Sequence, residues 1–295
     1  MPGAVRPRRS VLFVPGSNAR AIAKARELAA DVLVFDLEDS VAPAAKPDAR
    51  AAIAAALAAG GYGGRELAVR VNALATPWGR DDLAAAARWP VDAVLLPKVE
   101  SAAPVHDAER FLRSGGARAR VALWCMLETP RGILRAEAIA AASPRVAALV
   151  MGTEDLAKDL RAEPGRDRLP LLLALELGLL AARAYGLAAI DGIHADLDDD
   201  DGFAASCRQG RALGFDGKSL IHPKTIAAAN AAFAPSAAAL AWARRVIDAH
   251  AAAVAAGSGV TLLDGRLIEH LHVAEAERVL ALAAAIAALE PPATC

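Results

Sequence analysis

The sequence contains few cysteines and no cysteine pair. Three occur among its 295 residues, Cys125, Cys207 and Cys295, and no two of them stand in a Cys-x-x-Cys arrangement. Thiolate zinc sites of the common kinds need such pairs, and the disulfide framework of a small secreted protein needs an even number of cysteines. The sequence therefore excludes both classes. We interpret the cysteines as structural residues of a reduced, cytoplasmic protein.

The sequence also has no excess of charge of one sign. It carries 33 lysines and arginines against 34 aspartates and glutamates, a formal net charge of -1, and the arginines are scattered along the chain. A nucleic-acid backbone is held by a basic patch or stripe, and none is present here. We therefore expect no nucleic acid among the partners.

Long uninterrupted apolar runs are lacking as well. The longest candidate, residues 169–190, is interrupted by Glu176 and Arg183, so we predict a buried helix there rather than a membrane span. Near the start, the apolar run 11–14 stops at Pro15 and is too short for a signal peptide. We expect no association with a membrane.

Up to about residue 222, short apolar runs alternate regularly with helix-like segments. The runs have the length and the bounded character of buried strands, and the segments between them have helical spacing. Eight strands are expected, at residues 11–14, 32–35, 67–71, 93–96, 121–127, 146–151, 188–193 and 217–221. Because no Gly-x-Gly-x-x-Gly fingerprint of a dinucleotide-binding sheet occurs, we predict an α/β fold of the (β/α)8 TIM-barrel type.

The chain is long enough to continue beyond such a barrel. We expect a catalytic barrel domain at residues 1–230 and a C-terminal helical extension at residues 231–295. Within the extension, residues 235–256 and 272–289 have helix-like sequence, whereas residues 258–263 are expected to be irregular or extended.

Two of the predicted strands end in carboxylates. The run 121–127 is followed by Glu128, and the run 146–151 is followed by Gly152, Thr153, Glu154 and Asp155, with a predicted helix at residues 132–142 between them. Strands of such a unit are parallel, so Glu128 and Asp155 leave neighbouring strands at the same end and can share a hard cation. The alternative is that each acid caps the next helix, although a threonine stands beside each as another candidate.

Other polar residues also follow predicted strands, at the face where barrel enzymes keep their active sites. They are Asp36, Glu38, Arg70, Asn72, Lys98, Asp191 and His222. A role as loop residues or helix caps is an equal alternative for Asp36 and Glu38. Arg70 lies inside an apolar strand, where a guanidinium is costly unless it is paired or used, which favours a site role. His222 fits a structural role better than that of a ligand.

Seven segments together resemble the citrate lyase β-subunit family, within the HpcH/HpaI aldolase superfamily that includes malyl-CoA and citramalyl-CoA lyases. They are RSVLFVPGS (9–17), DVLVFDLEDSVAP (31–43), VRVN (69–72), LPKVE (96–100), LETPRGI (127–133), GTEDLAKDL (152–160) and GFDGKSLIHP (214–223). The resemblance implies a Mg²⁺-dependent carbon–carbon lyase on a TIM barrel that assembles as a homotrimer or hexamer. Mn²⁺ is an alternative, because it accepts the same oxygen ligands.

The resemblance also implies roles for individual residues. Glu128 and Asp155 would be the metal ligands, and Arg70 would bind and activate the substrate. Asp36 and Glu38 would hold metal-bound waters. At the start of the helix after Glu128, the amide groups following Thr129 and Pro130 are expected to hold a keto-acid carboxylate. Near the first strand, Arg20 and Lys24 are expected to contact the phosphates of a CoA-like carrier.

One segment departs from the family pattern. In lyases of this family, a stretch resembling residues 260–268 closes over a neighbouring subunit's active site, and an aspartate commonly follows it. Here the following residue is Glu269, one methylene longer. Glu269 is therefore a candidate catalytic residue, and its length decides between a lyase alone and a lyase that also hydrolyses the thioester.

The leading functional prediction is cleavage, or formation, of a small 3-hydroxyacyl-CoA thioester such as malyl-, citramalyl- or citryl-CoA, with a keto acid and acetyl-CoA as products. One alternative is the β subunit of a citrate lyase complex, whose citryl thioester is carried on an acyl carrier protein. A second is a non-catalytic protein that binds keto acids through the metal. A CoA-free pyruvate aldolase is a further alternative.

Overall fold

The computed structural model describes residues 5–119 and 121–289. The chain separates into two compact units, Arg8–Phe233 and a second unit that contains Ala234 and the residues after it together with the segment before Arg8. We describe each unit by itself. Of the three cysteines, Cys125 and Cys207 are buried and free, and Cys295 lies outside the described residues.

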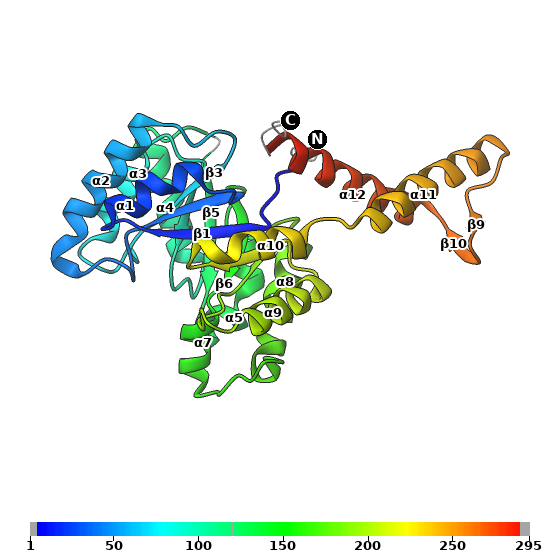
Figure 1. Ribbon diagram of the computed structural model, residues 1–295. Helices are drawn as coiled ribbons and strands as arrows, with labels where there is room; N and C mark the ends of the chain where they lie inside the picture. Colours follow the sequence, from blue (N-terminus) through cyan, green and yellow to red (C-terminus); the bar gives the residue numbers. More distant parts are fainter. Residues whose placement is uncertain (1–4, 120, 290–295) are drawn as a thin grey trace. The chain divides into compact units, whose positions relative to one another are not determined.

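The first unit is a closed barrel of parallel strands in the order β1 to β8 (Figure 1). Each strand pairs with the next in the sequence, and β8 pairs with β1 to close the barrel. The predicted TIM barrel is thus confirmed. The strands are β1 (Ser10–Pro15), β2 (Val32–Asp36), β3 (Glu66–Arg70), β4 (Ala93–Leu96), β5 (Ala122–Leu127), β6 (Val146–Met151), β7 (Ala188–Asp191) and β8 (Gly217–Leu220).

Helices and short 3-10 turns connect the strands and cover the outside of the barrel (Figure 1). They are α1 (Ala19–Lys24), η1 (Ala25–Glu27), η2 (Pro43–Ala45), α2 (Lys46–Ala59), α3 (Gly79–Ala86), α4 (Ala102–Ser114), α5 (Pro130–Leu134), α6 (Ala136–Ala140), α7 (Thr153–Leu160), η3 (Leu169–Leu171), α8 (Leu172–Ala184), α9 (Asp200–Leu213), η4 (Pro223–Thr225) and α10 (Ile226–Phe233). The helix expected at residues 132–142 is interrupted at Arg135, whose backbone leaves the helical region. The buried helix expected at residues 169–190 is shorter and only partly buried, because Leu173 is 70% exposed.

The strands separate two apolar layers. Val32, Leu95 and Trp124 belong to a cluster inside the barrel, whereas their neighbours Leu33 and Leu123 belong to the larger cluster between the strands and the helices. Successive side chains of a strand point to opposite faces, so a strand that is buried on both faces has apolar residues at every position. This is why β4, β5 and β6 are continuous apolar runs in the sequence.

A group of buried charges lies outside the barrel wall, where β7 and β8 meet α9. Lys218 Nζ donates to Asp191 Oδ2 at 3.0 Å, Arg168 donates to Asp191 Oδ1 at 2.7 Å, and both Asp191 and Lys218 have no exposed surface. Burial alone would raise the pKa of Asp191, but the two cations hold it below its ordinary value. The prediction that Asp191 belongs to the active face is therefore wrong: the carboxylate is committed to a structural ion cluster.

The second unit contains α11 (Ala237–Ala255), a two-stranded hairpin of β9 (Thr261–Leu263) and β10 (Arg266–Ile268), and α12 (His270–Leu289) (Figure 1). Ala243, Val246, Ile268 and Ala276 form its small core. The two expected helices are present. The hairpin turns at Asp264-Gly265, where both residues have positive φ (49° and 76°), as a tight two-residue hairpin loop requires.

One stretch, Pro223–Ala255, is by length and composition alone apolar enough to cross a membrane, with a mean hydropathy of 1.3. It comprises η4, α10 and α11, and residues 234–236 between the last two, including Pro235, lie outside both helices. A single such stretch is weak support for a membrane protein. The expectation of no membrane association stays a prediction.

The ion cluster outside the barrel gives a stability prediction. Asp191→Asn should lower the free energy of unfolding by about 3–5 kcal/mol, because it leaves two buried cations without their counter-charge. Urea denaturation followed by circular dichroism measures the change. Glu27→Gln is the control, since it removes a carboxylate from an exposed pair with Lys24 and should leave the unfolding midpoint unchanged. Equal stability of the two variants would contradict the prediction.

Candidate active site

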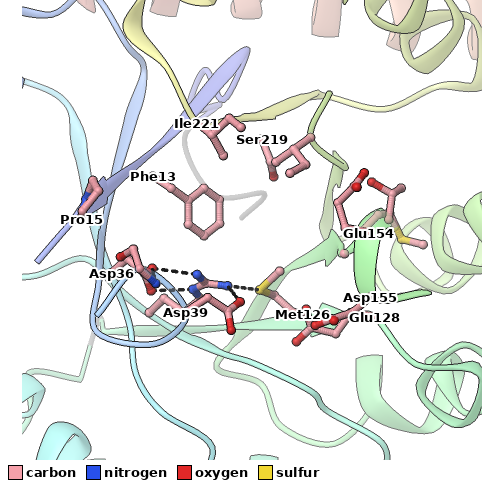
Figure 2. A pocket seen from close by; sticks show the side chains of 16 residues that line it. Phe13, Pro15, Asp36, Asp39, Met126, Glu128, Glu154, Asp155, Ser219 and Ile221 are labelled. Carbon is pink, nitrogen blue, oxygen red and sulfur yellow. Dashed lines mark hydrogen bonds and ion pairs between the residues drawn. The ribbon is translucent and has the colours of Figure 1, made fainter. Parts of the chain in front are cut away.

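A cavity of about 440 Å³ lies at the carboxyl ends of the barrel strands (Figure 2). It is lined by residues that follow or end most of the strands: Phe13, Pro15, Asp36, Asp39, Ser40, Arg70, Met126, Glu128, Met151, Gly152, Thr153, Glu154, Asp155, Ile193, Ser219 and Ile221. The cavity is therefore at the face where barrel enzymes carry their active sites. Charged side chains gather over β2 to β6, and apolar side chains cover the wall from β7, β8 and β1.

Glu128 directly follows β5 and is almost fully buried. Its Oε1 accepts a hydrogen bond from the Lys98 backbone N–H at 2.5 Å. Burial raises the pKa of Glu128, and the nearby Asp155 raises it further. A side chain at Gly152 would place Cβ only 2.7 Å from Glu128 Oε2, so glycine is required for the carboxylate to lie beside the end of β6.

Neither Glu128 nor Asp155 is a helix cap. Thr129 caps α5, because its hydroxyl accepts the Gly132 N–H at 3.1 Å. Asp155 lies in the first turn of α7, and the residue that precedes this helix, Gly152, provides no side-chain cap. The capping alternative is thus removed for both acids. Figure 2 shows Glu128 and Asp155 together on one side of the cavity.

The two acids fit a magnesium ion. Among the residues that the structure describes, no group of three or more His, Cys, Asp or Glu side chains could hold a metal, so a closed transition-metal site is not formed there. Mg²⁺ instead takes one or two carboxylates and keeps waters or substrate at its other positions. Glu128 has a raised pKa and a neighbouring carboxylate, and a cation between the two would favour the ionised form of both.

Arg70 at the end of β3 is held by Asp36 at the end of β2. Arg70 Nε and Nη2 donate to the two oxygens of Asp36 at 2.6 and 2.7 Å, and Nη1 lies 3.1 Å from Glu38 and from Asp39. Burial alone would lower the pKa of Arg70, but these carboxylates raise it above its ordinary value. The guanidinium stands over the ring of Phe13, 5.1 Å from its centroid. Arg70 is therefore charged, rigid and presented to the cavity.

The oxygens of Asp36 have further partners in the backbone. Oδ1 accepts the Glu38 N–H at 2.9 Å and Oδ2 accepts the Ser40 N–H at 3.1 Å, in addition to the bonds from Arg70. Burial would raise the pKa of Asp36, yet these donors hold it below its ordinary value. Asp36 thus orients Arg70 and its own loop. Its expected role in holding metal-bound water stays a prediction.

Lys98 is a component of the site that the sequence placed at the active face without a role. It follows β4, and its ammonium lies 2.8 Å from Glu38, 3.5 Å from Asp155 and 3.7 Å from Asp39. Burial and the hydrogen bond with Asp39 raise the pKa of Glu38 to about 7, against the opposing effect of Arg70 and Lys98. The position of Lys98 after a predicted strand indicated that it lies at the active face. Its partners are distant in the sequence, so no local pattern indicated its contacts.

The remaining predicted site residues lie away from the lining of this cavity. At the start of α5, Pro130 has no N–H and the Gly132 amide donates to Thr129, but the expected contact of this helix start with a keto-acid carboxylate stays a prediction. Arg20 and Lys24 are exposed on α1, and Lys24 pairs with Glu27. Their predicted contacts with a carrier stay a prediction.

Glu269 belongs to the C-terminal unit, where it links β10 to α12. Its backbone N–H donates to His272 Nδ1 at 3.2 Å. Its predicted part in catalysis stays a prediction. Two other polar residues that follow strands are structural: Asn72 bonds to Asp82, and the His222 ring accepts the Lys224 N–H.

The chain matches the HpcH/HpaI aldolase/citrate lyase family over residues 9–223. It is 47% identical over 282 residues to a (3S)-malyl-CoA thioesterase of Cereibacter sphaeroides, with 96% of each chain covered. It is 40% identical over 283 residues to the citrate lyase subunit beta of Escherichia coli, with 94% of each covered.

Two solved structures are also similar to this chain. CitE of Mycobacterium tuberculosis in complex with magnesium, acetoacetate and coenzyme A matches with a TM-score of 0.75 at 33% identity, covering 96% of this chain and 100% of that one. The citrate lyase beta subunit of the same organism, complexed with oxaloacetate and magnesium, matches with a TM-score of 0.68 at 33% identity, covering 80% and 100%. The chain therefore belongs to the HpcH/HpaI aldolase/citrate lyase family, and it is a lyase.

Proposed function

We propose that the protein is a Mg²⁺-dependent carbon–carbon lyase that cleaves, or forms, a small 3-hydroxyacyl-CoA thioester such as malyl-, citramalyl- or citryl-CoA. The products of cleavage are a 2-oxo acid and acetyl-CoA. One observation carries the proposal: two carboxylates, Glu128 and Asp155, meet at one cavity with the rigid guanidinium of Arg70. Magnesium in the CitE structures supports the choice of cation, and Mn²⁺ is the alternative.

Glu128 and Asp155 would hold the cation through one or both of their oxygens. When bound, it supplies Lewis-acid polarisation of the oxygens of the 2-oxo acid. The helix α7 starts at the cavity, where Gly152 and Thr153 line the wall, and its N-terminus has no side-chain cap. The N-terminus of a helix stabilises an anion, and we assign it the carboxylate of the keto acid, in place of the start of α5.

Cleavage requires three coupled changes in the substrate. The 3-hydroxyl loses its proton and becomes the carbonyl of the 2-oxo acid, the C2–C3 bond breaks, and its electron pair forms the enolate of acetyl-CoA, which then takes a proton at C2. Arg70 is the charge that stabilises the enolate oxygen. Its two hydrogen bonds to Asp36 fix its direction before the substrate binds, so little reorganisation is needed during the reaction.

A second candidate activity is hydrolysis of the thioester. It is favoured by the relative named (3S)-malyl-CoA thioesterase, which is 47% identical to this chain. A third is action on a citryl thioester of an acyl carrier protein, favoured by relatives named citrate lyase subunit beta. Arg20 and Lys24 as phosphate contacts of the carrier, and assembly into a homotrimer or hexamer, are part of the same proposal.

The first test of the proposed function identifies the reaction products. With malyl-, citramalyl- and citryl-CoA as substrates, the protein should release acetyl-CoA and a 2-oxo acid with Mg²⁺ and be inactive with EDTA. Glu128→Gln should lower the rate at least ~100-fold, because an amide is a weaker ligand than a carboxylate. Chromatography of the acyl-CoA species, with a thiol reagent for free CoA, separates cleavage from hydrolysis.

Glu163→Gln is the matched control, since it makes the same chemical change at an exposed residue. Release of free CoA and a hydroxy acid without acetyl-CoA would assign hydrolysis, rather than carbon–carbon cleavage, as the activity on these three thioesters. Metal-independent turnover would contradict the assignment of Glu128 and Asp155. Turnover of the carrier-protein thioester alone would favour the citrate lyase subunit.

The second prediction tests whether Asp36 positions Arg70 for the transition state or supports binding of the substrate in the ground state. Asp36→Asn should lower kcat roughly 10- to 100-fold and change KM less than ~3-fold, because both oxygens of Asp36 are already engaged by Arg70 and by backbone amides and so act on the substrate through Arg70. Steady-state kinetics with the best thioester of the panel measures both constants. A raised KM with unchanged kcat would show that Arg70 binds the substrate carboxylate in the ground state instead.

A further inference from the structure

Charges of alternating sign form a continuous series around the rim of the cavity. Asp36 pairs with Arg70, and Arg70 Nη1 lies 3.1 Å from Glu38 Oε2. The other oxygen of Glu38 accepts a hydrogen bond from Lys98 Nζ at 2.8 Å, and Lys98 Nζ lies 3.5 Å from Asp155 Oδ2. The series therefore runs from β2 to β6 and ends at the proposed metal ligand Asp155.

The backbone of Lys98 has an unfavourable conformation. Its φ is +49°, in the left-handed region that residues with a side chain rarely adopt. The N–H of the same residue donates to Glu128 Oε1, and the next N–H, that of Val99, donates to Met126 O at 3.2 Å. Lys98 thus contacts one proposed ligand through its backbone and the other through its ammonium.

The Lys98 ammonium contacts Glu38 and Asp155 at different distances. The Lys98 ammonium is at full hydrogen-bonding distance from Glu38 but 3.5 Å from Asp155, and its side chain is 40% exposed. It can therefore leave Asp155 while it keeps Glu38. A divalent cation between Glu128 and Asp155 would repel the ammonium and would supply the counter-charge that it now provides.

We propose that Lys98 is an internal counter-ion of the metal site: its ammonium neutralises Asp155 in the metal-free protein and is displaced towards Glu38 and Asp39 when the divalent cation binds. This inference rests on the metal site of the proposed function. It makes Lys98 a positioning residue that sets cation affinity and that stabilises the acidic rim in the absence of metal.

The test is Lys98→Met, which keeps the length of the side chain and the demand on the backbone but removes the charge. Isothermal titration of the metal-free full-length protein with MgCl₂ should give a Kd roughly tenfold lower than in wild type, because the competing charge is gone. Thermal unfolding in EDTA should occur at a lower temperature than in wild type. The increase in Tm on adding saturating Mg²⁺ should be larger, since tighter binding stabilises more.

Lys158→Met is the matched control. Lys158 Nζ lies 3.9 Å from the other oxygen of the same Asp155, but the side chain is 78% exposed and the pair is screened by solvent. Its Kd for Mg²⁺ should stay within ~2-fold of wild type. Lys98→Arg keeps the charge and should restore a Kd closer to that of wild type than Lys98→Met does.

The outcomes distinguish this inference from the proposed function. If wild type binds Mg²⁺ and Lys98→Met binds it equally or more weakly, Lys98 is not a counter-ion of the site, and the metal site stands. An equal effect of Lys98→Met and Lys158→Met would also overturn the inference, because it would reflect net charge alone. If wild type binds no divalent cation while Glu128→Gln is folded and behaves identically, the metal site itself fails.

Discussion

The ion pair between Asp36 and Arg70 determines how the rest of the acidic rim is arranged. A closed parallel barrel brings the carboxyl end of every strand to one rim, so acids that follow β2, β5 and β6 accumulate around one cavity. Without fixed cations these acids would repel one another. Arg70 and Lys98, from the two strands between them, alternate with the acids, and the series ends at Asp155.

The buried charges of the barrel form two groups, one outside the strand wall and one at the cavity. Asp191 is paired with both Lys218 and Arg168 on the outside of the wall, away from the cavity, and these pairs hold β7 and β8 to the surrounding chain. On the inside, burial raises the pKa of Glu38 and of Glu128, and each of these carboxyl groups has a neighbouring acid. Such unbalanced groups are what a site needs in order to respond to a ligand.

Much of this arrangement follows from local sequence, and the rest depends on partners that are distant along the chain. Continuous apolar runs locate β4 and β6 to the residue, because both faces of each strand are buried. The outward direction of Asp191 also follows from its place after the inward-facing Ile190, but only if the two-residue alternation is counted. The Asp264-Gly265 hairpin had a clear turn signal. The role of Lys98, in contrast, depends on Glu38 and Asp155, which no local pattern connects to it.

The shape of the cavity restricts the substrate more than the charges alone do. In the proposed function its polar half would receive a carboxylate and the oxygens that the cation would bind, whereas Phe13, Met126 and Ile221 cover other parts of the wall. Within the described residues, the hydroxyl of Ser219 on this wall is buried and has no hydrogen-bond partner. A substituent at C3 of the substrate must therefore be small in a space of about 440 Å³, and one polar atom near Ser219 would be favoured over a purely apolar group. Discrimination between a hydrogen, a methyl and a carboxymethyl group at C3 is then a property of this wall rather than of the metal ligands.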